Sequence, residues 1–189
     1  MLIPFGLGLA AGTGQAPWGL WFVTVAALAF WLNRPKFTRR AAFCDGWLFG
    51  AGYFAVSLHW IVSPFLVDIG STGWMAPFAL ILMVGGVALF WAVASYVARP
   101  GSMVSAGLMI AGAEALRSYL FTGFPWALLG HIWIDTPLAQ LAAFGGPHLL
   151  TLVTVMLGVA CALLLQRQIW AVTPPLAAVL GWVILSTGP

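Results

Sequence analysis

Two ionisable residues, Glu114 and Arg117, lie inside a strongly apolar run at about residues 103–120. Residues three apart share one face of a helix, so the two side chains are expected to lie side by side. Ionisable groups within a membrane are costly and usually face a partner, a cavity or water. The pair therefore predicts either a site that holds a polar or charged head group, or a structural pair that pins helices together or reaches to the interface.

A second candidate is the stretch TGFPWALLGHIWIDTPL, residues 122–138, which interrupts the hydrophobic pattern with Pro and Gly residues. It carries Trp126, Trp133, His131 and Asp135. Backbone that leaves a helix near membrane depth must be buried in protein or must line a wet cavity. The stretch is therefore expected to be a re-entrant plug, the wall of a site, or a packed cap at the interface.

The three histidines, His59, His131 and His148, are all expected near one membrane face. None of them forms a pair with metal-ligand spacing on one helix, and no carboxylate stands at a fixed offset from them. The two cysteines, Cys44 and Cys161, lie in or beside different apolar runs and are interpreted as small apolar fillers. The sequence therefore predicts no metal and no other cofactor.

Composition indicates the class of protein that must position these residues. The chain has 189 residues, of which 62% are hydrophobic and 6% are charged, and its mean hydropathy is +1.04. A soluble domain has about 25% charged residues. The chain is therefore predicted to be an integral membrane protein. Its formal charge of +3 forms no basic stripe, which argues against nucleic acid as a partner.

The apolar runs are long and continuous, which is typical of spanning helices and not of the short alternating strands of a membrane barrel. The sequence thus predicts an all-α, polytopic transmembrane helix bundle with about seven spans. The expected spans are about residues 2–14, 18–32, 42–63, 74–98, 103–120, 147–166 and 169–186. Together they are expected to form a single domain, 1–189, with an irregular outer-face loop at about 121–146. The glycine-rich pieces FGAG (49–52) and VGGV (84–87) are expected to permit close helix packing.

The basic residues predict the orientation in the membrane, because cytoplasmic loops carry an excess of Lys and Arg. The second expected span is followed by Arg34, Lys36, Arg39 and Arg40, the fourth by Arg99 and the sixth by Arg167. The loops on the opposite side, 64–73 and 121–146, contain Asp68 and Asp135 and no Lys or Arg. The N-terminus is therefore expected in the cytoplasm and the C-terminus on the outer, periplasmic face.

The stretch LRSYLFTGFPWALLGHIWIDTPLAQLAAFGG, residues 116–146, resembles the membrane region of bacterial apolipoprotein N-acyltransferases. In that family an acidic residue and an arginine precede Thr-Gly-Phe-Pro-Trp, and Leu-Gly, Pro-Leu and the Gly-containing start of the next helix follow. The matching residues here are Glu114, Arg117, Thr122 to Trp126, Leu129-Gly130, Pro137-Leu138 and Gly145-Gly146. The stretch GWLFGAGYFAVSLHWI (46–61) adds to the resemblance, which covers nearly the whole chain and is strongest over 112–150.

The resemblance implies a function in lipid chemistry at the bacterial inner membrane. The full enzymes of the family move an acyl chain from a phospholipid to the N-terminal amine of a lipoprotein. By resemblance, phospholipid and lipoprotein are the expected partners, and the helical bundle would bind them at its outer face. The candidate residues of this lipid cavity are Trp60, Glu114, Arg117, Phe124, Pro125, Trp126, His131, Trp133 and Asp135.

The chain departs from the family pattern at several positions. The family usually has Tyr and Gln where this chain has His131 and Trp133, and a Tyr-Gly pair where it has Pro147-His148. The family's Glu-Lys-Cys triad, which uses an activated thiolate as acyl acceptor, lies in a nitrilase-like domain after the seventh span. The single lysine here, Lys36, is expected on the cytoplasmic side. The chain is therefore expected to be a truncated membrane half that is catalytically inactive alone.

Two other functions stay open at this point. A scaffold of this kind could serve as a non-catalytic structural or binding subunit of a larger complex, with other membrane proteins as its partners. A small transporter or channel is the third interpretation, although neither an internal repeat nor abundant intramembrane charge supports it.

Overall fold

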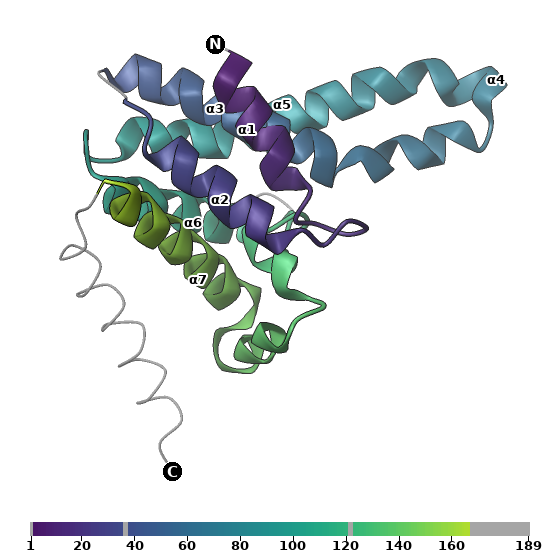
Figure 1. Cartoon of the computed structure of the whole chain (residues 1–189). Coiled ribbons are helices and arrows are strands. Elements are labelled where there is room, and N and C mark those ends of the chain that lie inside the picture. Colours follow the sequence, from purple (N-terminus) through teal and green to yellow (C-terminus); the bar gives the residue numbers. More distant parts are fainter. Residues whose placement is uncertain (1, 36–37, 121–122, 167–189) are drawn as a thin grey trace.

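The computed structural model describes residues 2–35, 38–120 and 123–166, and every regular element in these ranges is a helix or a helical turn (Figure 1). The α-helices are α1 (Leu2–Gly12), α2 (Trp21–Leu32), α3 (Arg39–Ser57), α4 (Ile69–Thr72), α5 (Ala76–Val97), α6 (Met103–Tyr119) and α7 (Ala142–Leu165). The 3-10 helices are η1 (His59–Leu66), η2 (Gly73–Met75), η3 (Leu129–Trp133) and η4 (Pro137–Leu141). The predicted all-α class is confirmed for the described residues.

Side-chain caps and a proline mark where three of the helices begin. Thr38 Oγ1 accepts a hydrogen bond of 3.1 Å from the amide of Ala41 and caps α3. Ser102 Oγ accepts one of 3.1 Å from the amide of Ser105 and caps α6. Pro77 lies in the first turn of α5, where its missing amide hydrogen has no helical partner to lose. Each cap satisfies an amide that the helix itself leaves unpaired.

The helices pack mainly through α3 and α7. α3 packs against both α1 and α5, and α7 packs against both α2 and α6. Aromatic rings fill the core where α2, α3 and α5 meet. Phe49 stacks with Trp31 and with Trp91, at centroid distances of 4.6 and 5.6 Å, and Tyr53 stacks with Trp91 at 5.0 Å. These four side chains are fully buried, so they form the interior of the bundle.

Close approach of α1 and α3 depends on glycine. A Cβ added at Gly52 would lie 2.2 Å from the carbonyl oxygen of Phe5, and one at Gly8 would lie 2.1 Å from that of Phe49. The expectation of close packing at FGAG is therefore confirmed. The expectation for VGGV holds only in part: Gly85 accepts a hydrogen bond of 3.1 Å from Trp47 Nε1 of α3, whereas a Cβ at Gly86 would meet no atom within 4 Å.

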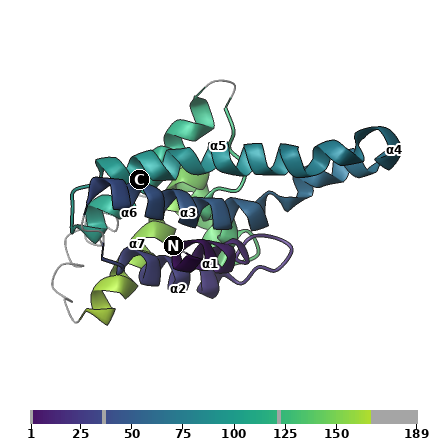
Figure 2. The ribbon, with the colours of Figure 1, turned by 90° about the horizontal axis from the view of Figure 1, so that it is seen from above.

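A long helical hairpin extends beyond the other helices (Figure 1, Figure 2). It consists of α3 with η1 on one side and α5 on the other, with α4 at its tip. No residue of η1, α4 or η2 is buried. The hairpin bends by 46° between α3 and η1, so the expected span 42–63 is not one straight helix. Ser57 Oγ donates a hydrogen bond of 2.8 Å to the carbonyl of Tyr53 just before the bend, a contact that often bends helices.

Two described helical segments, Ile69–Val97 and Pro137–Leu165, are long and apolar enough to cross a membrane. A third qualifies if α3 and η1 count as one bent span. α1 and α2 have 11 and 12 residues, which corresponds to about 16–18 Å of helix. That length is shorter than the hydrocarbon core of about 30 Å. The expected span 169–186 lies outside the described residues, so the count of about seven spans stays a prediction.

Candidate functional site

Glu114 and Arg117 form a buried ion pair on α6. Arg117 Nη2 lies 3.5 Å from Glu114 Oε1, and the side chains are 1% and 0% exposed, respectively. The spacing of three residues places both groups on the same face of the helix, as the sequence predicts. A buried pair usually needs hydrogen bonds to its remaining polar atoms, and among the described residues all of them except Arg117 Nε have a partner. The partners of those atoms therefore show what the pair does.

Arg117 holds the backbone of the loop that follows α6. Its Nη1 donates hydrogen bonds of 2.9 Å to the carbonyl of Phe124 and 2.8 Å to the carbonyl of Trp126. The guanidinium carbon also lies 5.2 Å from the ring centroid of Phe54 and 5.8 Å from that of Phe124. Carbonyls that leave regular helix within a membrane need such donors. Arg117 thus fixes the course of residues 124–126.

Glu114 holds the next part of the same loop. Its Oε2 accepts a hydrogen bond of 2.9 Å from the amide of Leu129 and one of 3.2 Å from Thr151 Oγ1 on α7. Thr151 Oγ1 in turn accepts a bond of 3.1 Å from the amide of Gly130. A Cβ at Gly130 would lie 2.5 Å from the carbonyl of Pro147, so this position requires glycine. The carboxylate therefore docks the start of η3 between α6 and α7.

Gln15, which follows α1, completes this support from the other side. Its Nε2 donates hydrogen bonds of 2.6 Å to the hydroxyl of Tyr53 and 2.8 Å to the carbonyl of Leu128. Both Gln15 and Tyr53 are buried. Three separate elements thus hold the backbone of residues 124–130.

Trp133, a predicted cavity residue, points into the protein. It is 2% exposed, and its indole Nε1 donates a hydrogen bond of 2.7 Å to Thr154 Oγ1 on α7. Its ring lies 5.2 Å from that of Trp21, and it packs with Ile132 and Leu150. The structure therefore places Trp133 as an anchor of η3 rather than on an open surface.

Trp126 points the other way and forms an exposed aromatic pair with Trp60 of η1. The two residues are 57% and 44% exposed, and their ring centroids lie 5.7 Å apart in an edge-to-face arrangement. The reversal occurs at Ala127, which has a φ of 54° and is followed by the buried Leu128. A non-glycine residue with such a φ is uncommon and must be held by its surroundings. Here the hydrogen bonds on either side supply that restraint.

The remaining predicted site residues do not form one cluster with Trp60 and Trp126. Pro125 is exposed beside Trp126, Phe124 is half-buried over Arg117, and Asp135 is exposed beyond η3. His131 is half-buried, and burial together with the positive charge of Arg117 lowers its pKa. In the described ranges no group of three His, Cys, Asp or Glu residues could hold a metal ion.

Sequence reasoning missed four residues of the network: Gln15, Tyr53, Thr151 and Thr154. All four are polar residues in or beside apolar runs, and Thr151 and Thr154 are three apart on one helix. Polar side chains inside a membrane bundle usually bind one another or the backbone. That rule could have marked them as candidates, although it could not name their partners.

The described residues of this site offer noncovalent contacts to a ligand. The site combines an exposed aromatic surface with a loop backbone that buried side chains hold in place. Tryptophan suits a membrane–water interface, because its ring is apolar and its indole N–H is polar. The exposed pair of Trp60 and Trp126 therefore consists of side chains of the type that suit such an interface.

Comparison with known proteins shows the family to which the chain is similar. Residues 7–161 match the family described as apolipoprotein N-acyltransferase N-terminal domain. Relatives described as apolipoprotein N-acyltransferase occur in Caulobacter vibrioides, Pseudomonas syringae pv. tomato and Rhodopseudomonas palustris. They are 39%, 31% and 35% identical over 85%, 84% and 87% of this chain. The chain spans 32%, 33% and 34% of their lengths, which is about one third of each.

Proposed function

The chain belongs to the family of the apolipoprotein N-acyltransferase N-terminal domain, and on that premise we propose that its outer loop holds lipid substrates for N-acyl transfer. The substrates would be a phospholipid as acyl donor and a lipoprotein as acceptor. The exposed pair of Trp60 and Trp126 would contact the amphipathic part of these molecules. The buried Glu114–Arg117 pair would hold the loop backbone in position and would not contact the substrates.

One observation supports this proposal above the others. Arg117 is buried and binds the carbonyl of Trp126, while the Trp126 side chain lies on the surface beside Trp60. A loop that only capped the bundle would gain more by burying this ring, because exposed aromatic surface contributes nothing to the core. The rigid presentation of an exposed tryptophan instead suits recognition at an interface.

The proposal includes a placement in the membrane. The chain would form a single transmembrane domain of about seven spans in the bacterial inner membrane. The N-terminus would be cytoplasmic and the C-terminus periplasmic, because Arg34, Arg39, Arg40 and Arg99 lie in segments expected on one side. The loop that carries Trp126 would then lie at the periplasmic face.

The proposal assigns substrate binding to this chain and the transfer step to other residues. Cys44 lies in α3 near the basic segments and Cys161 lies in α7, so neither cysteine belongs to the loop site. A thiolate nucleophile needs an activating base and a water-accessible place. Residues 1–189 alone should therefore bind lipid substrates and transfer no acyl chain.

Photo-crosslinking tests the proposal. Residues 1–189 would be purified in mild detergent and mixed with a diacylated lipopeptide that carries a photoreactive group beside its N-terminal cysteine. Mass spectrometry would then locate the crosslinked residues. Crosslinks should concentrate in 124–135 and in η1, and excess phospholipid should reduce them.

The alternatives give different results in the same experiment. Crosslinks spread evenly along the apolar helices would mean that the loop has no special affinity for lipopeptide. A stoichiometric membrane protein that co-purifies, with no specific crosslink in the loop, would favour the structural-subunit alternative. Acyl transfer by residues 1–189 alone would contradict the assignment of catalysis to other residues.

A further inference from the structure

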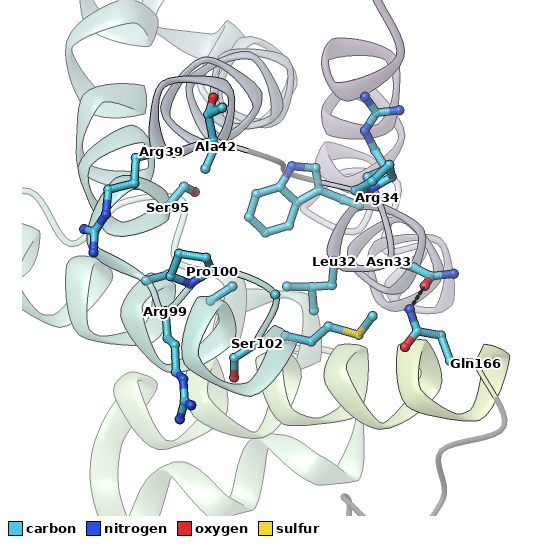
Figure 3. A pocket seen from close by; sticks show the side chains of 17 residues that line it. Leu32, Asn33, Arg34, Arg39, Ala42, Ser95, Arg99, Pro100, Ser102 and Gln166 are labelled. Atoms are coloured by element: carbon cyan, nitrogen blue, oxygen red, sulfur yellow. Dashed lines mark hydrogen bonds between the residues drawn. The ribbon is translucent and has the colours of Figure 1, made fainter.

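A cavity of about 240 Å³ lies where the ends of α2 and α5 meet the starts of α3 and α6 (Figure 3). α6 begins here and reaches the loop site at its other end, so the two sites are about 25 Å apart along this helix. The described residues that line the cavity include three arginines and neither Asp nor Glu. The cavity is therefore electropositive and separate from the site described above.

Two of the three arginines are available for an anion. Arg34 is compensated, because its Nε lies 3.2 Å from Asp45 Oδ1. Arg39 and Arg99 have no carboxylate partner within the described part of the chain, and Figure 3 shows their side chains extending outward from the cavity in different directions, away from Arg34. Arg39 is held in place by a hydrogen bond of 3.2 Å from its Nη1 to the carbonyl of Tyr96. The rim thus carries two uncompensated positive charges.

A buried hydroxyl on the wall of the cavity also lacks a partner. Ser95 is 5% exposed, and its Oγ makes no hydrogen bond within the described ranges. Its side chain lies among those that line the cavity (Figure 3). Its oxygen has almost no accessible surface and faces Gly46 of α3, so it lies in the packed interface of α3 and α5 and not in the open part of the cavity.

An apolar groove of about 390 Å³ lies beside the cavity, between α5 and α6. Val97, the last residue of α5, lines the groove, and Ala98 and Arg99, which directly follow α5, line the cavity. On α6 the cavity includes Ala106 and the groove begins at Met109, three residues further along the same face. The basic rim and the apolar groove are therefore neighbours on both helices.

We propose that the cavity and the groove together bind one anionic phospholipid. Its phosphate would lie beside Arg39 and Arg99 at the rim of the cavity. One acyl chain would lie along the α5–α6 groove. Guanidinium groups pair well with phosphate oxygens, and the inner leaflet, where basic loops are expected, is rich in anionic lipid.

The groove distinguishes this ligand from a free anion. Inorganic phosphate could satisfy the arginines and would leave the groove unused. A zwitterionic phospholipid could fill the groove, but its own cation would compete for the phosphate. An anionic phospholipid uses both features.

The test compares three ligands on the full chain purified in neutral detergent. Phosphatidylglycerol, phosphatidylcholine and inorganic phosphate would each be titrated. Retained lipid would be counted by native mass spectrometry, and Tm would be followed by differential scanning fluorimetry. Phosphatidylglycerol should bind at one per chain and raise Tm, with at least about tenfold higher affinity than phosphatidylcholine. Inorganic phosphate at millimolar concentration should change neither readout.

Three variants locate the site. R39Q/R99Q should lose the preference for phosphatidylglycerol, because the charge at the rim is removed. G112L should weaken both phospholipids, because Gly112 lines the groove and a Cβ there would meet no atom within 4 Å. R40Q is the matched control, since Arg40 is exposed in the same segment and does not line the cavity. If R39Q/R99Q does not fold, G112L still tests the groove.

Each contrary result has a definite meaning. Equal retention of the two phospholipids would show ordinary solvation by bulk lipid and would overturn the proposal. A response to inorganic phosphate equal to that of phosphatidylglycerol would show an anion site without a lipid. An equal loss of binding in R40Q and R39Q/R99Q would show that net charge alone, and not this rim, attracts the lipid.

Discussion

Arg117 donates a hydrogen bond of 2.8 Å to the carbonyl of Trp126, although the arginine is buried and the tryptophan is 57% exposed. This contact joins the interior of the bundle to its surface. It explains how a loop of irregular backbone can present an aromatic ring in a fixed position. The first three predictions below follow from it and from the other contacts that hold this loop.

Replacement of Arg117 should destabilise the protein strongly. Arg117→Ala leaves Glu114 buried without its partner and frees two carbonyls, so the expected loss is about 3–5 kcal/mol. Arg117→Lys keeps the charge but cannot reproduce the guanidinium fork, so its loss should be intermediate. Thermal unfolding of the full chain in detergent would measure both. Arg40→Ala, at an exposed position, should leave Tm unchanged; a similar loss in that control would point to a general charge effect.

Trp126→Ala should weaken lipopeptide binding without much loss of stability. The side chain is 57% exposed, so little core packing disappears with it. Crosslinking yield at the loop should fall several-fold, and Trp60→Ala should have a similar effect because the two rings touch. Trp74→Ala is the control, since Trp74 is 67% exposed on the hairpin and far along the chain from this loop. Equal losses in all three variants would refute a special role for the loop.

Trp133→Phe should lower stability and leave the exposed surface intact. The change removes the 2.7 Å hydrogen bond to Thr154, which is expected to contribute about 1 kcal/mol. Thr154→Val alone would also remove the hydrogen bond from Thr154 to the Leu150 carbonyl. A double-mutant cycle that combines Trp133→Phe with Thr154→Val is therefore needed to isolate the bond between Trp133 and Thr154. A coupling energy near zero would show that Trp133 is held by packing alone.

Gly52→Ala should separate α1 from α3. Its new Cβ would lie 2.2 Å from the carbonyl of Phe5, and backbone cannot yield as a flexible side chain would. The expected loss is about 1–3 kcal/mol, measured as a lower Tm in detergent. Gly86→Ala is a matched control on α5, because a Cβ there would meet no atom within 4 Å. Its Tm should stay the same or rise, since alanine favours a helix.

Much of the fold could be predicted from local patterns. Long apolar runs predict helices because each backbone group must find its partner within its own segment in lipid. The bend after Ser57 was not predictable in this way, because apolar character continues through it and only the backbone geometry shows it. The sequence could not show that Gly85 lies against Trp47 while Gly86 meets no neighbour, because a glycine permits close packing without requiring it.

The candidate site was also predictable in part from local patterns. Periodicity places Glu114 and Arg117 on one face, and Pro and Gly mark the loop as irregular. Periodicity does not show that Trp126 faces outward and Trp133 inward, since both lie in a segment without a regular repeat. That difference arises from Ala127 and from the hydrogen bond to Thr154.

The sequence by itself determined the all-α class of the described residues, the approximate position of most of their helices and the place where the pattern breaks. These properties depend on composition and on neighbours along the chain, so they can be predicted without knowledge of the tertiary structure. Only the tertiary structure decided which groups satisfy Glu114, because Leu129 lies in the loop after α6 and Thr151 lies on α7. It also brought Arg39 and Arg99 to one cavity, since the packing of α3 against α5 joins residues 60 positions apart.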